Sequence, residues 1–158
     1  MNRYATNFYA IDCETTGFKR NELVQFASVH YVNGKEVSKV VRSIMPEGEF
    51  TESALRTHGL SRKVLKQRGA KMFSKATSDM IMNYLNIMKD LPIVAHNVEY
   101  DRDKVLKPAF KKVGNLDAMP PDSRWRCTLE LANKIPGLNM VTLDDALEHF
   151  GFERRDVD

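Results

Sequence analysis

Residues 8–17, FYAIDCETTG, join a short apolar segment to two carboxylates and a glycine. We expect residues 8–12 to form a buried strand, because aromatic and aliphatic side chains dominate them. Side chains alternate between the faces of a strand, so Asp12 and Glu14 are expected on one side and Cys13 on the other. Paired oxygen ligands of this kind suit Mg²⁺ or Mn²⁺, although an isolated Asp-x-Glu is more often a strand end with exposed acids.

Outward from this segment, the sequence alternates between patterns typical of strands and of helices. Asn33-Gly34 predicts a tight hairpin, and residues 142–145 resemble a capping box that opens a last helix. This order indicates one α/β domain whose first three strands form an antiparallel meander in a mixed sheet. The expected strands are 24–32, 37–44, 92–96 and 124–128, and the expected helices are 51–59, a short one from 61, 74–89, 100–113 with a kink or restart at Pro108, 128–135 and 142–150.

The chain has 158 residues, 42% hydrophobic and 28% charged, which suits a single domain with its own core. No apolar run approaches the roughly 18 residues of a membrane helix, and the first residues lack the apolar stretch of a signal peptide. Cys13 and Cys127 stand far apart, outside any Cys-x-x-Cys pair. We therefore expect no disulfide, no zinc site and no membrane partner, and we expect a protein of the reducing cytoplasm.

Basic residues are concentrated in two segments, although the net charge is only +3. Residues 56–75 hold seven basic residues and no acidic one, and residues 102–112 hold five, diluted by Asp103. Such a surplus can attract a phosphate backbone. Charge alone favours a solvated helix face instead.

A second group of polar residues, His96-Asn97-Val98-Glu99-Tyr100-Asp101, follows the expected fourth strand. Asp101 falls in the first turn of the next helix, where the helix dipole favours a carboxylate. It is either an ordinary helix-starting residue or a third carboxylate beside the first two, if strands one and four are neighbours. Glu99 and Asp103 are rivals for that role, but Asp103 cannot share the helix face of Asp101.

Together, Asp12-x-Glu14-Thr15-Thr16-Gly17 and His96-Asn97-x-x-Tyr100-Asp101 resemble the first two motifs of the DEDD exonucleases, the DnaQ-like 3′–5′ exonucleases. Thr57-His58-Gly59-Leu60 is similar to the family's His-Gly segment near the nucleotide pocket. Trp125-x-Cys127-Thr128-x-x-Leu131-Ala132 resembles the segment after motif two in the exonuclease X and proofreading-subunit branch. The resemblance covers nearly the whole chain. It implies an RNase H-like fold: a mixed five-stranded sheet flanked by helices, with strands 1–3 antiparallel and strands 4 and 5 parallel to strand 1.

The resemblance implies a metal-dependent 3′–5′ exonuclease that releases nucleotides from the 3′ end of single-stranded or frayed DNA. Asp12, Glu14 and Asp101 would be the catalytic residues and would hold two divalent ions, Mg²⁺ or Mn²⁺. One ion would generate hydroxide near the scissile phosphate, and the other would stabilise the departing 3′ oxygen.

The resemblance also implies five substrate-binding residues. Thr15 and Thr16 would line the 3′-terminal nucleotide through their backbone N–H and hydroxyl groups. Phe18 would stack on a base, unless it is an ordinary core residue. His58 and Asn97 would support the nucleotide or a carboxylate.

The sequence departs from the family after Asp101. The family's third motif, His-x-x-x-x-Asp or Tyr-x-x-x-Asp, supplies the fourth carboxylate and the general base, and neither form follows Asp101. His149, for instance, is followed five positions later by Arg154. We expect the His form beyond Asp158, so that residues 1–158 form a single exonuclease domain lacking its C-terminal third-motif helix.

Three other functions stay open. The same chemistry can act on short RNA, since one well-placed polar group suffices to read a 2′-OH. A catalytically inactive nucleic-acid-binding module is favoured by the missing third motif and disfavoured by the intact carboxylates, which repel phosphate. A small-molecule phosphohydrolase or an interaction scaffold can share the same α/β fold. The residues indicate neither an oligomeric state nor a pathway.

Overall fold

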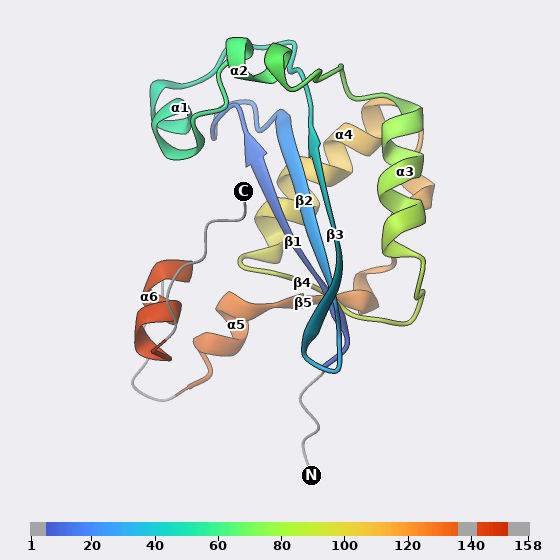
Figure 1. Ribbon diagram of the computed structural model, residues 1–158, viewed down its shortest axis with the longest axis vertical. Coiled ribbons are helices and arrows are strands. Elements are labelled where there is room, and N and C mark those ends of the chain that lie inside the picture. The colour runs from blue at the N-terminus through green and yellow to red at the C-terminus, as the bar shows by residue number, and fades with distance from the viewer. Residues whose placement is uncertain (1–5, 136–141, 152–158) are drawn as a thin grey trace.

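The computed structural model describes residues 6–135 and 142–151, and its centre is a five-stranded sheet (Figure 1). The strand order is β3-β2-β1-β4-β5. β1, β2 and β3 pair antiparallel, whereas β4 is parallel to β1 and β5 is parallel to β4. This arrangement confirms the expected mixed sheet. The strands are β1 (Phe8–Thr15), β2 (Leu23–Val32), β3 (Lys35–Ser43), β4 (Ile93–Ala95) and β5 (Trp125–Cys127).

The first strand is longer than the sequence predicts. β1 continues past Asp12 because its pairing with β2 continues, with Glu14 opposite Gln25 and Thr15 opposite Leu23 across a bulge. The acidic pair therefore lies inside the sheet rather than in a turn after it. The predicted hairpin is confirmed, since Asn33 (φ 52°) and Gly34 (φ 73°) both have the positive φ that a tight hairpin turn requires.

The helices mostly begin where the sequence predicts. The side chains of Thr51, Ser61 and Ser74 each accept a hydrogen bond from a backbone N–H of the first turn, and Thr142 forms the expected capping box with Asp145. The helices are α1 (Glu52–His58), α2 (Arg62–Gln67), α3 (Lys75–Leu85), the π-helix η1 (Glu99–Leu106), α4 (Lys107–Lys112), the short 3₁₀ turns η2 (Leu116–Ala118) and η3 (Asp122–Arg124), α5 (Thr128–Ala132) and α6 (Leu143–His149).

Three helices differ from the expectation, and the last of them along the chain is α5, which ends at Ala132 rather than at residue 135. α3 ends at Leu85 rather than at residue 89, and Ile87 and Met88 are exposed beyond it. The segment after the second motif is wound as a π-helix through Leu106 and becomes α-helical at Lys107. Pro108 then lies in the first turn of α4, the part of a helix in which proline is best tolerated. Residues 152–158, next to the place expected for the third motif, lie outside the described residues.

The main core lies on one face of the sheet. Tyr9, Ile11 and Cys13 of β1 point into it, and they pack with buried side chains of α3, η1 and α4. The residues between them, including Asp12 and Glu14, point to the other face, where they are exposed or half-buried. The alternation predicted for Asp12, Cys13 and Glu14 is thus confirmed.

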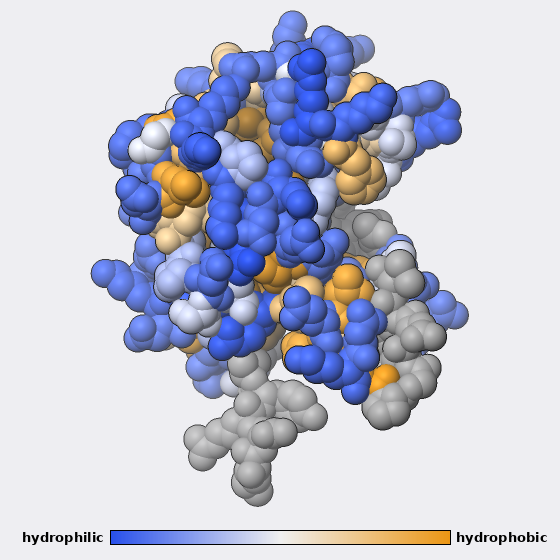
Figure 2. All heavy atoms as spheres, turned by 180° about the vertical axis from the view of Figure 1, so that it is seen from behind, coloured by the Kyte–Doolittle hydropathy of each residue, from blue (hydrophilic) through white to orange (hydrophobic). Residues whose placement is uncertain are grey.

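The surface is largely hydrophilic, and Figure 2 shows apolar side chains only in small separate groups on the face behind that of Figure 1. Among the described helices, none combines the length and the apolar character needed to cross a bilayer.

Candidate active site

The candidate site lies where β1 extends beyond its parallel neighbour. β4 pairs with β1 only through Ile93 and Val94, opposite Tyr9 and Ala10. After Ala95 the chain leaves the sheet and enters η1, so the edge of β1 beyond Ile11 has no strand partner on this side. The first turn of η1 brings Asp101 against this edge, beside Cys13 and Asp12.

Asp101 is an acid in an unfavourable position for a charge. Its side chain is only 4% exposed. Its pKa is raised to about 7, chiefly by burial and then by the negative charge of Asp12, while hydrogen bonds from Cys13 partly oppose the shift. Its Oδ1 is buried without a hydrogen-bond partner among the described residues. A buried carboxylate oxygen of this kind is strongly favoured to meet a proton or a cation.

The structure also separates Asp101 from its two rivals. Glu99 projects outward, with 72% of its side chain exposed, and pairs with Lys104 (3.5 Å). Asp103 pairs with Arg102 (2.8 Å) and Lys107 (2.7 Å), and these cations hold its pKa at about 2. Both rivals are neutralised away from the strand, so the acid coupled to the β1 carboxylates is Asp101.

Asp12, Glu14 and Asp101 offer the oxygen ligands that a divalent cation prefers, but they do not form a complete set of ligands by themselves. Asp12 and Asp101 interact electrostatically, and the charges of all three acids raise the pKa of the buried Cys13 thiol, after the larger effect of burial. Within residues 6–135 and 142–151, however, no three His, Cys, Asp or Glu side chains are gathered closely enough to hold a metal ion. The expected trio of Asp12, Glu14 and Asp101 therefore surrounds Cys13 electrostatically without being gathered around one centre among the described residues.

The loop after β1 is locked to η1 by a hydroxyl chain. Thr15 Oγ1 and the Tyr100 hydroxyl share a hydrogen bond of 2.8 Å, and the Tyr100 hydroxyl donates to Asn21 Oδ1 (3.2 Å). The Gly17 N–H in turn donates to Thr15 Oγ1 (3.2 Å). Sequence reasoning missed the contribution of Asn21. Its only signal is that asparagine tolerates the left-handed backbone found there, at φ 51°.

The backbone N–H and carbonyl of Thr16 both form hydrogen bonds within the protein. Its N–H donates to the Glu22 carbonyl (3.0 Å), and its carbonyl accepts from the Thr51 N–H (2.8 Å). The expected substrate contact through the Thr16 N–H is therefore not available in this conformation. Its hydroxyl is buried and has no hydrogen-bond partner among the described residues.

Phe18 is not a core residue. Its side chain is 81% exposed, and its ring meets the ring of Tyr100 edge-on with centroids 5.6 Å apart. An exposed aromatic ring beside the carboxylates is the type of surface on which a nucleobase stacks. The structure thus rules out a core role for Phe18 and is compatible with stacking on a base of the substrate.

The two remaining predicted residues shape the site through its backbone. His58 Nδ1 accepts from the Leu60 N–H (3.0 Å), so its Nε2 carries the proton and donates to the Thr15 carbonyl (3.0 Å). Both ring nitrogens are therefore used within the protein. Asn97 has a left-handed backbone (φ 67°), and its carbonyl accepts from the Tyr100 N–H (2.9 Å), which starts the turn into η1.

His96 was not among the predicted site residues, although it belongs to the second motif. Its Nδ1 lies 2.9 Å from Thr128 Oγ1, and its Nε2 is buried with no hydrogen-bond partner in the part of the chain described. Burial lowers the pKa of His96, which favours the neutral ring. The pair joins the end of β4 to the start of α5.

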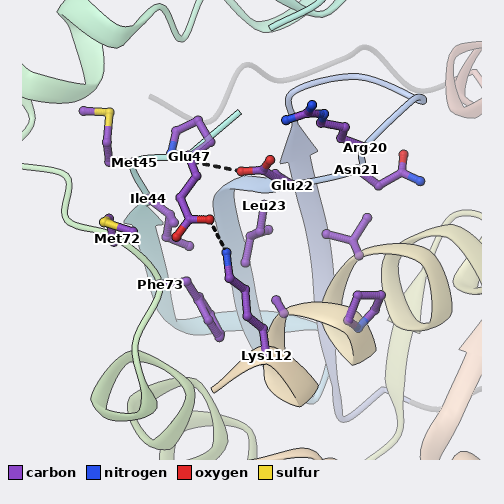
Figure 3. A pocket seen from close by; sticks show the side chains of 14 residues that line it. Arg20, Asn21, Glu22, Leu23, Ile44, Met45, Glu47, Met72, Phe73 and Lys112 are labelled. Carbon is purple, nitrogen blue, oxygen red and sulfur yellow. Dashed lines mark hydrogen bonds and ion pairs between the residues drawn. The ribbon is translucent and has the colours of Figure 1, made fainter. Parts of the chain in front are cut away.

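A cavity of about 130 Å³ adjoins the loop after β1, and Asn21 of that loop lines it (Figure 3). Leu23, Ile44 and Phe73 contribute apolar side chains to its lining, and Lys112 and Glu47, which also line it, form an ion pair. None of the three carboxylates lines it.

Gly17 offers a test of how tightly this loop is packed. Its φ is 121°, and an added Cβ would lie 2.7 Å from Thr51 Cγ2 and closer still to Oγ1. We expect Gly17→Ala to lower the free energy of unfolding by about 3 kcal/mol, through backbone strain plus overpacking. Urea denaturation measures this loss. The matched control is Gly59→Ala, also at positive φ (68°) but with nothing within 4 Å, which should cost about 1 kcal/mol; equal losses would refute the packing argument.

The fold defines the class of protein. Two solved structures share it: exonuclease X in complex with 5′ overhanging duplex DNA (TM-score 0.68, 22% identity, 94% of this chain and 75% of that chain) and a 3′-exonuclease bound to a histone mRNA stem-loop (TM-score 0.75, 14% identity, 98% and 74%). At these identities the likeness shows the fold alone. It is the RNase H-like fold of exonucleases.

The chain belongs to the exonuclease family. The family model Exonuclease (RNase_T) matches residues 9–156, nearly the whole sequence. The chain is 28% identical over 153 residues to DNA polymerase III subunit epsilon of Aquifex aeolicus, which covers 95% of this chain and 71% of that protein. It is 27% identical over 146 residues to DNA polymerase III PolC-type of Thermotoga maritima, covering 91% of this chain but only 10% of that protein. The resemblance to DnaQ-like 3′–5′ exonucleases is thus confirmed.

Proposed function

We propose that this chain is a metal-dependent 3′–5′ exonuclease that releases nucleotides from single-stranded or frayed DNA. The observation that carries the proposal is the coupling of Asp12 to the buried Asp101 at the unpaired edge of β1. A buried acid with an unsatisfied oxygen beside a second acid is costly for folding alone. Such an arrangement is typical of a site whose charge is completed by a ligand.

The residues have separate roles in this proposal. Asp12, Glu14 and Asp101 hold two divalent cations, Mg²⁺ or Mn²⁺, which would activate water and offset charge on the departing 3′ oxygen. Tyr100 and Phe18 present adjoining rings to the terminal base. The hydroxyl of Tyr100 holds the loop through Thr15, and so keeps these rings next to the carboxylates.

DNA is the favoured substrate because both sequence relatives are named as DNA polymerase III proteins. One structural neighbour is bound to a histone mRNA stem-loop, which keeps short RNA as the second candidate. The two substrates differ at each sugar by a 2′-OH, and at thymine by the 5-methyl group that uracil lacks. Matched DNA and RNA oligonucleotides of one sequence therefore distinguish them.

The test is hydrolysis of a 5′-labelled single-stranded oligonucleotide with Mn²⁺, and with EDTA as control. We expect a ladder that shortens from the 3′ end. Residues 1–158 should be compared with a chain extended through the codons that follow, because we infer that the general base and the fourth carboxylate belong to a third motif beyond Asp158. If both chains bind the oligonucleotide without cleaving it, the site belongs to a binding module instead.

A further inference from the structure

Four basic side chains form an exposed surface on and just after α2. They are Lys63, Lys66, Arg68 and Lys71, and we call them the α2 basic surface. Among the ion pairs of the described residues, none involves any of the four. Their charge is therefore available to a partner.

The second basic segment of the sequence is different. Arg102 and Lys107 pair with Asp103 and Asp122, and Lys104 and Lys112 pair with Glu99 and Glu47. The structure thus largely neutralises residues 102–112, in which the sequence alone shows only the one diluting acid, Asp103. Only one of the two segments presents a surplus of positive charge.

The α2 basic surface stands on a rigid base. Leu65 is fully buried and packs with Val24 and Leu60 in a small second core. This packing holds one face of α2 against the protein, so that the opposite face points to solvent. The guanidinium of Arg62 donates to the carbonyls of Pro46 (3.0 Å), Glu47 (3.1 Å) and Gly48 (2.8 Å), so the first residue of α2 is tied to the loop after β3. A preorganised surface loses little entropy on binding.

This surface lies beside the candidate site. α2 begins four residues after His58, which hydrogen bonds to the carbonyl of Thr15, and α1 and α2 lie at the same end of the sheet as the arrowhead of β1 (Figure 1). Six helical residues span about 9 Å. At the rise of about 3.4 Å per nucleotide of a B-form strand, that length corresponds to about three phosphates, and to fewer when the strand is extended.

We propose that the α2 basic surface binds the phosphate backbone of the substrate strand, on the 5′ side of the nucleotide that is being removed. The inference rests on the proposed function for the polarity of the strand. Ammonium and guanidinium groups contact phosphate without reading sequence, so the surface confers affinity and not base preference. The carboxylates repel phosphate, and α2 supplies the attraction that compensates for it.

The test is the double charge reversal Lys63→Glu/Lys66→Glu, with binding measured by fluorescence anisotropy on a labelled single-stranded oligonucleotide in EDTA. We expect affinity to fall about tenfold or more, uniformly across sequences. Between about 50 and 200 mM salt, the slope of log K against log salt should become shallower by about 1.4, at about 0.7 per single-strand phosphate contact. An unchanged affinity and slope would overturn the proposal.

The matched control is Lys35→Glu/Lys89→Glu, which makes the same change of charge at exposed positions near the opposite end of the sheet. It should bind like the wild type; an equal loss would mean that only net charge matters, and the α2 assignment would fail. Hydrolysis of the p-nitrophenyl ester of thymidine 5′-monophosphate by the extended chain tests the proposed function separately, because this phosphodiester carries nitrophenolate in place of the departing 3′ oxygen and has no strand for α2 to bind. If the ester is not hydrolysed, the proposed function is wrong. If the ester is hydrolysed but the double charge reversal leaves binding unchanged, only the α2 assignment is wrong.

Discussion

Replacing Asp12 with alanine is expected to abolish Mn²⁺-dependent hydrolysis of an oligonucleotide, with a rate loss of at least about a thousandfold. That loss corresponds to about 4 kcal/mol of transition-state stabilisation, as expected for a ligand of a catalytic metal. Folding should not suffer, because Asp12 is exposed and its charge raises the pKa of the buried Asp101. In metal-free buffer the melting temperature should be unchanged or raised.

The matched control for this prediction is Glu99→Gln. Glu99 lies two residues before Asp101 in the same motif, but its side chain is exposed and pairs with Lys104. It should keep close to full activity. The rates of both variants are to be measured on the extended chain. Equal activity of Asp12→Ala and the wild type would show that Asp12 takes no part in the mechanism. A clear loss of folding in Asp12→Ala would instead make Asp12 a structural residue.

The second large effect is a dependence of stability on pH that comes from Asp101. Its pKa is about 7 in the folded protein, against about 3.9 for an ordinary aspartate in the unfolded chain. Between these values the folded state keeps a proton that the unfolded state has released. The free energy of unfolding therefore falls as pH rises from about 4 to about 7, by up to about 4 kcal/mol, and is level above.

Asp101→Asn removes this titration while it keeps the shape of the side chain. Metal-free melting curves from pH 4 to 8 should show the variant losing less stability than the wild type, by the order of 10 °C in melting temperature at the upper end. Asp12→Ala should reduce the wild-type dependence, since it removes one cause of the raised pKa. Parallel curves for wild type and Asp101→Asn would contradict the burial argument.

Mn²⁺ gives an independent readout of the same group. At pH 8 the ionised Asp101 is expected to bind the cation, and a ligand at 100 times its dissociation constant stabilises the folded state by about 2.7 kcal/mol. The wild type should therefore gain stability from Mn²⁺, and Asp101→Asn should gain less.

Features that depend on neighbours in the sequence were predictable. The alternation of Asp12, Cys13 and Glu14 follows from the two-residue period of a strand, and Asn33-Gly34 carries its own turn preference. The helix starts after Thr51, Ser61 and Ser74 follow from side chains that cap a helix locally. The ordered motifs were enough to identify the family, which the match over residues 9–156 confirms.

Features that depend on distant partners were predicted less well. β1 is longer than expected because β2 continues to pair with it, and α3 is shorter because no partner covers Ile87 and Met88. The π-helical start of the segment after Asn97 has no recognised local signal. These differences arise because pairing and packing extend or end an element beyond its own propensity.

By itself the sequence determined the family, the strand that carries Asp12 and Glu14, and the short set of acids from which a third could come. The family resemblance already named Asp101 as that acid, and the tertiary structure added that it is buried beside Asp12, since β4 ends early and the first turn of η1 lies against β1. Only the tertiary structure distinguished the basic segments, because Glu47 neutralises Lys112 from a loop 65 residues away. Desolvation and Coulomb attraction act through space, whereas periodicity along the chain records only neighbours.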